Sequence, residues 1–118
     1  MNWINGLFNW RKNRDITVPS GKYVEMIEEE LQEYKDSETI EDKIDAIGDI
    51  IVLSVNECEL EGYNINLVMN EIVKEISSRL QCPEQAERDW IGKEKWKKSV
   101  LPEHQKLWYK ADFTNCKL

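Results

Sequence analysis

Two segments of helical periodicity, residues 23–34 and 40–58, constrain this chain most, because each places acidic residues inside an otherwise apolar face. The apolar positions of the first segment recur at spacings of three and four, at Tyr23, Ile27, Leu31 and Tyr34. At about 100° per residue, Glu30 falls near the centre of that stripe and Glu33 lies at its edge. The segment is therefore predicted to form an amphipathic helix with a glutamate where an apolar side chain is expected.

The second segment shows the same anomaly more strongly. Its apolar stripe consists of Ile40, Ile44, Ile47, Ile51, Val55 and Cys58. Residues 50–53 are apolar as well, so the turn around Asp49 has almost no polar side, which is typical of a buried helix. Asp45 lies four residues before Asp49 and shares its face, and Asn56 lies on nearly the same line. An aspartate in such a helix is costly unless it is paired or bound to a metal.

A short polar link, residues 36–39, joins the two segments, and Ser37 or Thr39 can cap the second helix. So short a link predicts two antiparallel helices that lie side by side. The inward acids would then face one space: Glu30, Glu33, Asp45 and Asp49. Mg²⁺, which prefers oxygen ligands, would relieve the repulsion among them, so the pattern predicts a Mg²⁺ site acting on a phosphate ester or anhydride. A purely solvated face remains the alternative for the outward glutamates, Glu25, Glu28 and Glu29.

These acidic runs resemble the motifs of a known family. Residues 29–33, Glu-Glu-Leu-Gln-Glu, are similar to the Glu-Glu-x-x-Glu motif of the MazG-like, all-α nucleotide pyrophosphohydrolases. Residues 45–53, Asp-Ala-Ile-Gly-Asp-Ile-Ile-Val-Leu, resemble the Asp-x-Ile-Gly-Asp-x-x-Val-Val-Leu run of small, often phage-encoded members. The resemblance covers about residues 10–81, and residues 82–118 would form a C-terminal helical extension.

Two features of this chain depart from the family pattern. The second motif is more often Glu-x-x-Asp, but here Ala46 stands three residues before Asp49. Either Asp45 takes that place, or Asp42 and Asp45 together supply the pair. The first motif could also begin one residue earlier. The later register is preferred because it turns the second and third glutamates of the motif inward.

The resemblance implies a hydrolase that converts a (deoxy)nucleoside triphosphate to the monophosphate and pyrophosphate with Mg²⁺, or with Mn²⁺ as a substitute. The implied metal ligands are Glu30, Glu33, Asp45 and Asp49. Glu29 and Glu30 are the implied catalytic residues, with Glu29 placed to polarise the attacking water. Two alternatives stay open. One is a related enzyme acting on phosphoribosyl-ATP or dUTP, and the other is a helical adaptor whose degenerate acidic site binds a partner protein.

The N-terminal residues 2–14 hold apolar and aromatic side chains at helical spacing and end in basic residues, which predicts a short amphipathic helix. Residues 10–16 resemble the Trp-x-x-x-Arg-Asn-Leu opening of the small phage members, and this implies that Trp10 and Arg14 contact the substrate. An aromatic face binds any base, so Trp10 could stack on one. The alternative is that Trp10 and its aromatic neighbours only cover the helical bundle.

A further helix is predicted from an apolar face made of Ile65, Val68, Met69, Ile72, Ile76 and Leu80. Residues 75–79, Glu-Ile-Ser-Ser-Arg, resemble the Glu-Ile-Lys-x-Arg run that closes the family's conserved region. In that interpretation the guanidinium of Arg79 reaches the triphosphate oxygens. The alternative is a surface ion pair between Arg79 and Glu75, four residues apart.

Composition narrows the class of protein. A chain of 118 residues is expected to form one domain, and a net charge of −7 argues against binding nucleic acid. No apolar run approaches the roughly 18 residues of a membrane span. The N-terminus lacks an apolar signal core, and three cysteines do not suggest a disulfide framework, so we expect a cytoplasmic protein, in the host cytoplasm if phage-encoded. Five tryptophans and the apolar turn at residues 50–53 predict a homodimer or homotetramer.

The predicted fold is all-α and resembles a four-helix bundle, with additional C-terminal helices. Pro19 breaks the chain, and Ser20 is the expected N-cap of the first acidic helix. Gly62 is the expected end of the second acidic helix. Two more helices are expected, one over residues 84–98 and another that starts at Pro102 and continues through residues 107–109.

Overall fold

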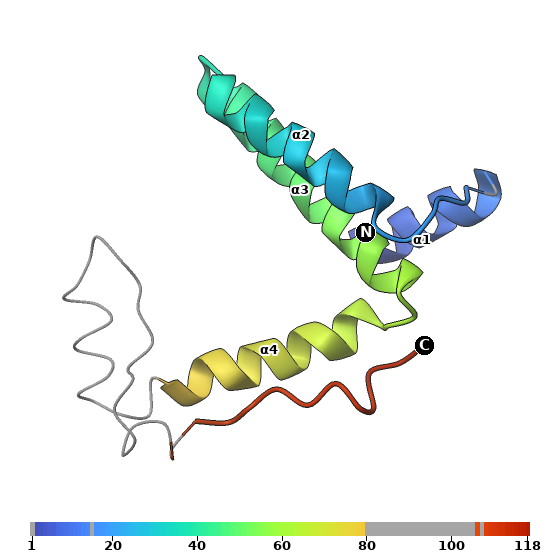
Figure 1. Ribbon diagram of the computed structural model, residues 1–118, viewed down its shortest axis with the longest axis vertical. Helices are drawn as coiled ribbons and strands as arrows, with labels where there is room; N and C mark the ends of the chain where they lie inside the picture. Colours follow the sequence, from blue (N-terminus) through green and yellow to red (C-terminus); the bar gives the residue numbers. More distant parts are fainter. Residues whose placement is uncertain (1, 15, 80–105, 107) are drawn as a thin grey trace. The chain divides into compact units, whose positions relative to one another are not determined.

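The computed structural model describes residues 2–14, 16–79, 106 and 108–118, and within them it contains α-helices and no β-strand (Figure 1). The helices are α1 (Trp3–Arg14), α2 (Lys22–Asp36), α3 (Ile40–Leu60) and α4 (Ile65–Arg79). This confirms the all-α class, whereas the four-helix-bundle arrangement stays a prediction. The chain divides into two compact units, one of Met1–Tyr63 with Leu118 and one of Asn64–Lys117. The expectation of one domain also stays a prediction.

α2 and α3 pack along each other as an antiparallel hairpin, as the short link predicts (Figure 1). Thr39 caps α3, because its Oγ1 accepts a hydrogen bond from the Asp42 N–H at 3.1 Å. α3 ends where expected, since Gly62 has a φ of 91° and donates its N–H to the Glu59 carbonyl at 2.9 Å. The residue that follows a helix often has a left-handed conformation, and it is then usually glycine. Local sequence therefore sets both ends of α3.

The start of α2 differs from the prediction that made Ser20 its N-cap. The N-cap is Gly21, which has a φ of 83° and makes no side-chain cap. The Ser20 hydroxyl donates instead to the carboxylate of Glu61, and the Gly21 N–H donates to Glu57 Oε1 at 2.7 Å. Acidic side chains at the end of α3 thus hold the N-cap residue of α2 and the residue before it, so a tertiary contact and not a side-chain cap fixes where α2 begins.

α3 buries a different face from the one that its apolar stripe indicates. Ala46, Leu53 and Asn56 are between 2% and 8% exposed, on the side that α2 covers. Of the stripe residues, Val55 alone is buried, at 4% exposure. The stripe residues Ile40 and Ile44 are 69% and 61% exposed, and Ile47 and Ile51 are 41% and 47% exposed. The prediction of a helix buried on nearly every side is therefore wrong for these turns in the single chain. The reason is that α2 covers one face, and the exposed part of the stripe lies on nearly the opposite side of the helix, roughly 160° away at 100° per residue.

The N-terminal helix α1 is tied to α3 by an ion pair between Arg11 and Glu59, whose side chains are only 14% and 11% exposed. Its aromatic side chains are not covered in the same way, because Trp3, Phe8 and Trp10 are each about half exposed. Half of the surface of each is therefore covered, and the alternative that these aromatic side chains cover the helical bundle stays a prediction.

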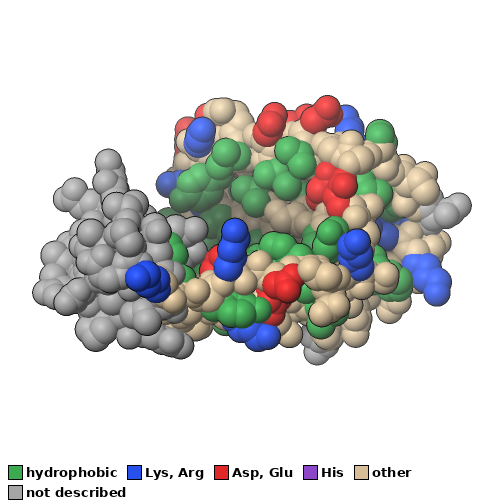
Figure 2. All heavy atoms as spheres, turned by 60° about the horizontal axis from the view of Figure 1, so that its bottom comes forward, with side chains coloured by type: hydrophobic (Ala, Val, Ile, Leu, Met, Phe, Trp, Pro, Cys, Tyr) green, Lys and Arg blue, Asp and Glu red, His purple; other side chains and the backbone are tan. Residues whose placement is uncertain are grey.

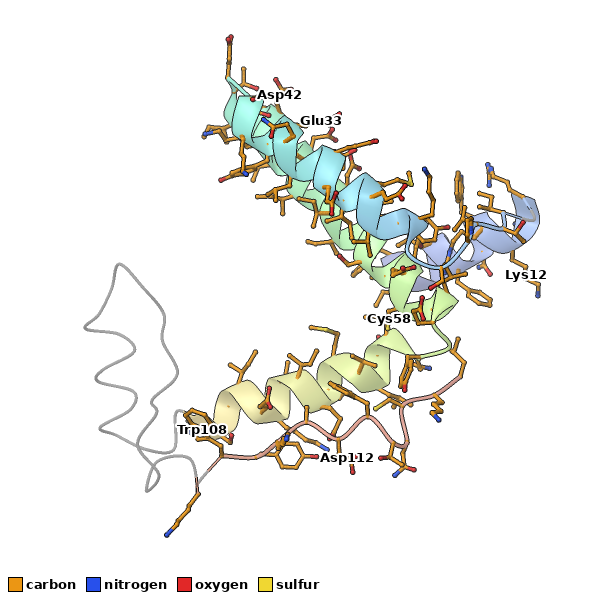
Figure 3. All side chains as sticks on the ribbon, in the orientation of Figure 1. Lys12, Glu33, Asp42, Cys58, Trp108 and Asp112 are labelled. Atoms are coloured by element: carbon orange, nitrogen blue, oxygen red, sulfur yellow. The ribbon has the colours of Figure 1, made fainter. Side chains whose placement is uncertain are left out.

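In the second unit, residues 108–117 run along α4 without helical structure (Figure 3). The prediction of a helix from Pro102 onward is wrong at Tyr109. The Tyr109 N–H donates to the side chain of Ser78 at 2.8 Å, a contact with α4 rather than with its own preceding turn. The helix expected over residues 84–98 lies outside the described residues.

Apolar side chains are common on the surface of the described residues. Figure 2 shows them exposed among acidic and basic side chains on the face that it draws. Among the described residues, no helix combines the length and the apolar character that a membrane span requires.

We predict that Gly62→Ala destabilises the protein by about 1–2 kcal/mol, because an L-residue strains the left-handed backbone there. A Cβ at this position would meet no atom within 4 Å, so the effect is conformational and not steric. The matched variant is Gly48→Ala in the middle of α3, where a Cβ also meets nothing within 4 Å. It should stabilise by about 1 kcal/mol through helix propensity. Chemical denaturation checks both, and equal effects of the two substitutions would contradict the assignment of Gly62 as the helix end.

Candidate functional site

Glu30 of α2 and Asp49 of α3 are the inward acids of the hairpin. Both are partly buried, and Asp49 lies between Ala46 and Leu53 on the buried side of α3. One oxygen of Glu30, Oε2, is inaccessible to solvent and has no hydrogen-bond partner among the described residues. A buried carboxylate oxygen without a donor is unfavourable, and proteins normally supply a donor or a cation to such an atom.

The pKa of Glu30 is raised to about 7. The largest cause is a side-chain hydrogen bond with Glu33, followed by burial and by the negative charges of Glu33, Asp49 and Asp45. A hydrogen bond between two carboxyl groups requires a proton, so this contact favours the protonated form of Glu30. A negative charge raises the pKa of another carboxyl group only when the two lie close together, so the four acidic residues belong to one group. We call it the acidic cluster: Glu30, Glu33, Asp45 and Asp49.

The pKa of Asp49 is raised as well, first by burial and then by the charges of Asp45 and Glu33. No ion pair to Asp49 is found among the described side chains. Lys43, a basic residue of the same helix, has its Nζ 5.7 Å from the centre of the Tyr34 ring. The inner part of the acidic cluster therefore carries negative charge without a described cation beside it.

A hollow of about 310 Å³ adjoins the acidic cluster toward the turn of the hairpin. It is lined by Glu33, Asp36, Ser37, Asp42 and Asp45. Figure 3 shows Glu33 and Asp42 near this closed end. Asp42 lines the hollow but is not among the charges that raise the pKa of Glu30 or Asp49, whereas Asp45 is. Of the two alternatives for the missing motif acid, the geometry therefore favours Asp45.

Within the first unit, the predicted site residues Glu29, Trp10 and Arg14 are not part of the acidic cluster. Glu29 is exposed and takes part in no hydrogen bond or ion pair within the described residues. Trp10 and Arg14 contact each other: the guanidinium lies 4.6 Å from the centre of the indole ring and also donates to the Trp10 carbonyl at 3.2 Å. Arg79 ends α4 in the second unit, and its side chain is outside the described part of the chain, so its role stays a prediction.

The donor set of the acidic cluster suits a hard divalent cation, because every potential ligand is a carboxylate oxygen. In their present rotamers, no three Asp, Glu, His or Cys side chains among the described residues are arranged to hold a metal ion. Glu33 and Asp45 are exposed, so their side chains can rotate toward an ion. The unpartnered Oε2 of Glu30 already lies inside the hairpin. The residues thus fit Mg²⁺ or Mn²⁺ by chemistry, after rotation of the outer side chains.

Sequence reasoning missed a cavity at the other end of the hairpin, with a volume of about 470 Å³. It is lined by Phe8, Arg11, Lys12, Ile16, Val18, Tyr23, Glu59, Leu60 and Leu118. The Arg11–Glu59 pair forms part of its wall, and Arg11 Nε is buried without a partner. The basic end of the first helix was the signal in the sequence, but its partner in α3 is 48 residues away.

No protein family, curated protein or solved structure matches this chain. An assignment of function therefore depends on the motifs and on the geometry of the acidic cluster.

We predict that the metal-free protein loses stability as the pH rises from about 4.5 to about 7. Glu30 in the unfolded chain releases its proton near 4.5, whereas the folded protein keeps it until about 7, so rising pH favours unfolding in this window. Glu30→Gln imitates the protonated form. In the presence of a chelator its melting temperature should exceed that of the wild type at about pH 8, and the difference should vanish near pH 4.

Thermal unfolding followed by circular dichroism measures this difference. Glu28→Gln is the matched control, because Glu28 is an exposed glutamate of the same helix, and it should show no such pH-dependent difference. A Glu30→Gln protein that melts below the wild type at both pH values would show that the carboxylate is stabilising and contradict the repulsion described above.

Proposed function

We propose that this chain is a Mg²⁺-dependent nucleotide pyrophosphohydrolase that converts a (deoxy)nucleoside triphosphate to the monophosphate and pyrophosphate. The observation that carries the proposal is the acidic cluster. Carboxylates from two antiparallel helices raise the pKa of Glu30 and Asp49, and no described cation compensates them. The resemblance of residues 29–33 and 45–53 to the family motifs supports the same reaction.

In this proposal Glu30, Glu33 and Asp49 hold the metal, and Asp45 ligates it or orients a ligand. Bound Mg²⁺, or Mn²⁺, supplies Lewis acidity and a template for phosphate oxygens. Glu29 polarises the attacking water, because it is exposed one residue before Glu30 and would not be engaged by the ion. Water then replaces pyrophosphate on the nucleotide, the anhydride bond between the first two phosphates breaks, and a carboxylate takes the proton of the water.

Trp10 and Arg14 remain proposed substrate contacts, together with Arg79 of the second unit. Arg14 already covers one face of the Trp10 ring at 4.6 Å. A base would therefore stack on the other face or displace the guanidinium, which would then be available for phosphate oxygens. The cytoplasm is the proposed compartment.

A second copy of the chain is the proposed cover for the apolar stripe of α3, in a homodimer or homotetramer. Ile40, Ile44, Ile47 and Ile51 form four consecutive positions of one helical face and are 41–69% exposed. Fully burying an isoleucine side chain contributes roughly 1.5–3 kcal/mol. The same stripe on a second copy would be complementary in length and character, so both copies would gain from a symmetric contact.

The exposed apolar stripe of α3 also favours one alternative function, a helical adaptor that binds a partner protein through the stripe and the acids beside it. The absence of a preformed three-ligand arrangement among the described residues is also compatible with an adaptor. Hydrolytic activity separates the two. A related substrate, phosphoribosyl-ATP or dUTP, would keep the enzyme class and change only the specificity.

We predict that the purified protein releases pyrophosphate from at least one nucleoside triphosphate in the presence of Mg²⁺ and that a chelator stops the reaction. Asp49→Asn should lower the rate by more than the roughly 10- to 100-fold that is typical of changes around metal ligands. A panel of NTPs and dNTPs, with dUTP and phosphoribosyl-ATP included, tests this with a pyrophosphate assay. Orthophosphate as the first product, or no turnover on any member of the panel, would contradict the proposal.

Two controls separate catalysis from folding in that experiment. Glu28→Gln changes an exposed acid of α2 and should leave the rate unchanged. The metal-free melting temperature of Asp49→Asn should stay level or rise, because the substitution removes a charge from the acidic cluster. A drop of several degrees that is independent of Mg²⁺ would make Asp49 a structural residue.

We predict that the wild-type protein is a dimer or tetramer at micromolar concentration and that Ile44→Glu converts it to a smaller species. The substitution places a charge in the middle of the apolar stripe. Val73→Glu is the matched variant, because Val73 is a similarly exposed apolar residue, at 54%, on α4 and outside the stripe. Light scattering after size-exclusion chromatography measures the masses. A monomeric wild type, or equal effects of both variants, would contradict assembly through the stripe.

A further inference from the structure

One face of α4 presents a row of hydrogen-bond acceptors. Glu71, Glu75 and Ser78 follow one another at spacings of four and three, so they lie along one line of the helix. Ser78 is buried, at 5% exposure, and the side chain of Glu71 is 12% exposed. None of these residues belongs to the acidic cluster; Glu75 and Ser78 fall within residues 75–79, the run that resembles the end of the family's conserved region, but the substrate contact implied by that resemblance is Arg79.

The row accepts backbone N–H groups from the extended segment at residues 109–112. The bonds, from donor to acceptor, are Tyr109 N–H to Ser78 Oγ at 2.8 Å, Ala111 N–H to Glu75 Oε1 at 3.4 Å, and Asp112 N–H to Glu71 Oε1 at 3.1 Å. The segment thus runs antiparallel to α4. Bonds to backbone N–H groups recognise an extended chain and depend little on its side chains.

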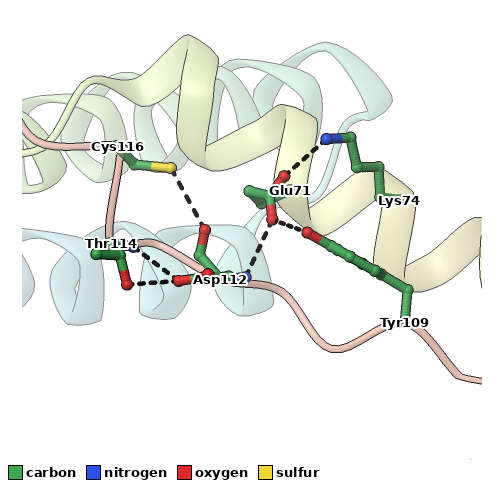
Figure 4. A network of polar contacts seen from close by, with 6 residues as sticks. All are labelled: Glu71, Lys74, Tyr109, Asp112, Thr114 and Cys116. Atoms are coloured by element: carbon green, nitrogen blue, oxygen red, sulfur yellow. Dashed lines mark hydrogen bonds and ion pairs between the residues drawn. The ribbon is translucent and has the colours of Figure 1, made fainter.

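Glu71 is the centre of these contacts (Figure 4). Its carboxylate also accepts from the Tyr109 hydroxyl and from Lys74 Nζ, the latter at 2.9 Å. The hydrogen bond from Tyr109, followed by those from Lys74 and Asp112, lowers the pKa of Glu71 to about 2. Glu71 therefore stays charged at any physiological pH, and protonation does not control the contact.

Little apolar burial holds the segment in place. Tyr109 and Phe113 are each 39% exposed, and Cys116, at 3%, is the one fully buried side chain among the described residues of the segment. The end of the segment is tied separately, because the Asn64 N–H donates to the Cys116 carbonyl at 2.7 Å. Residues 109–112 are held mainly by polar bonds to α4, and such a stretch opens at a small cost compared with a packed core element.

We propose that this face of α4 is a binding site for an extended peptide backbone and that residues 109–112 occupy it in cis as a releasable latch. The site selects a tyrosine at the first position and an available N–H at the first, third and fourth positions. The second position, Lys110, has an exposed side chain and is not recognised. This role is independent of the acidic cluster.

The test uses the full chain and a fluorescein-labelled peptide with the sequence of residues 106–117, under reducing conditions. A full-length variant carrying Tyr109→Ala and Asp112→Pro lacks the hydroxyl and one N–H of the latch but keeps the acceptors of α4. It should bind the peptide about tenfold more tightly than the wild type, in which the tethered segment competes at high effective concentration. Adding Glu71→Gln to this variant should abolish the gain. Fluorescence anisotropy measures the binding.

The matched control is Lys110→Ala in the full chain, which should bind the peptide as weakly as the wild type. Amide exchange in α4, measured by NMR, reports whether the helix persists in the latch-broken variant. No peptide binding while α4 stays protected would overturn the proposal. Loss of α4 in that variant would also overturn it, because the segment would then be part of the fold and not a releasable ligand. Equal uptake of peptide by the wild type would overturn occupation in cis.

Discussion

The packing of α2 against α3 is the contact on which the rest of this structure depends. It buries Tyr23, Ala46 and Leu53, and in doing so it draws Glu30 and Asp49 into the same partly buried space. Burial and like charge both disfavour ionised carboxylates, so the hairpin carries an electrostatic cost at that point. Contacts at the end of the hairpin away from the α2–α3 link offset this cost. They are the hydrogen bond from the Gly21 N–H to Glu57 and the ion pair between Arg11 of α1 and Glu59.

Two features of the described hairpin are left without a partner, its inner negative charge and its outer apolar stripe. Its interior has an excess of negative charge, which a cation would neutralise. Its outer face has an apolar stripe from Ile40 to Ile51, which another protein surface would cover. The acids and the stripe lie on nearly opposite faces of α3, so a metal could neutralise the first and a second chain could cover the second without interfering with each other. An enzyme uses both features, whereas an adaptor needs only the second.

The second unit is built on a different principle. Within it, α4 holds residues 108–117 mainly through side-chain acceptors for backbone N–H groups, and little apolar area is buried. Contacts of this type make an extended segment specific in position and still easy to exchange. The hairpin, by contrast, has its small apolar core and its partly buried acids on the same pair of helices. A substitution in the acidic cluster therefore also affects the packing of α2 against α3.

The features determined by the sequence alone are those with a local physical cause. Helical periodicity predicted the four helices that the structure describes, and the short polar link at residues 36–39 predicted the hairpin. Ser37 or Thr39 and Gly62 were the predicted ends of α3, and the structure selects Thr39 as the cap. The position of Glu30 within its stripe predicted an inward carboxylate. Features that depend on partners distant in the chain were decided only by the tertiary structure. These are the face of α3 that meets α2, the cap of α2 by Glu57 and the extended course of Tyr109 along α4. In each case the local sequence preference was overridden by a tertiary contact. That contact was a hydrogen bond to a residue more than 30 positions away, or packing against another helix.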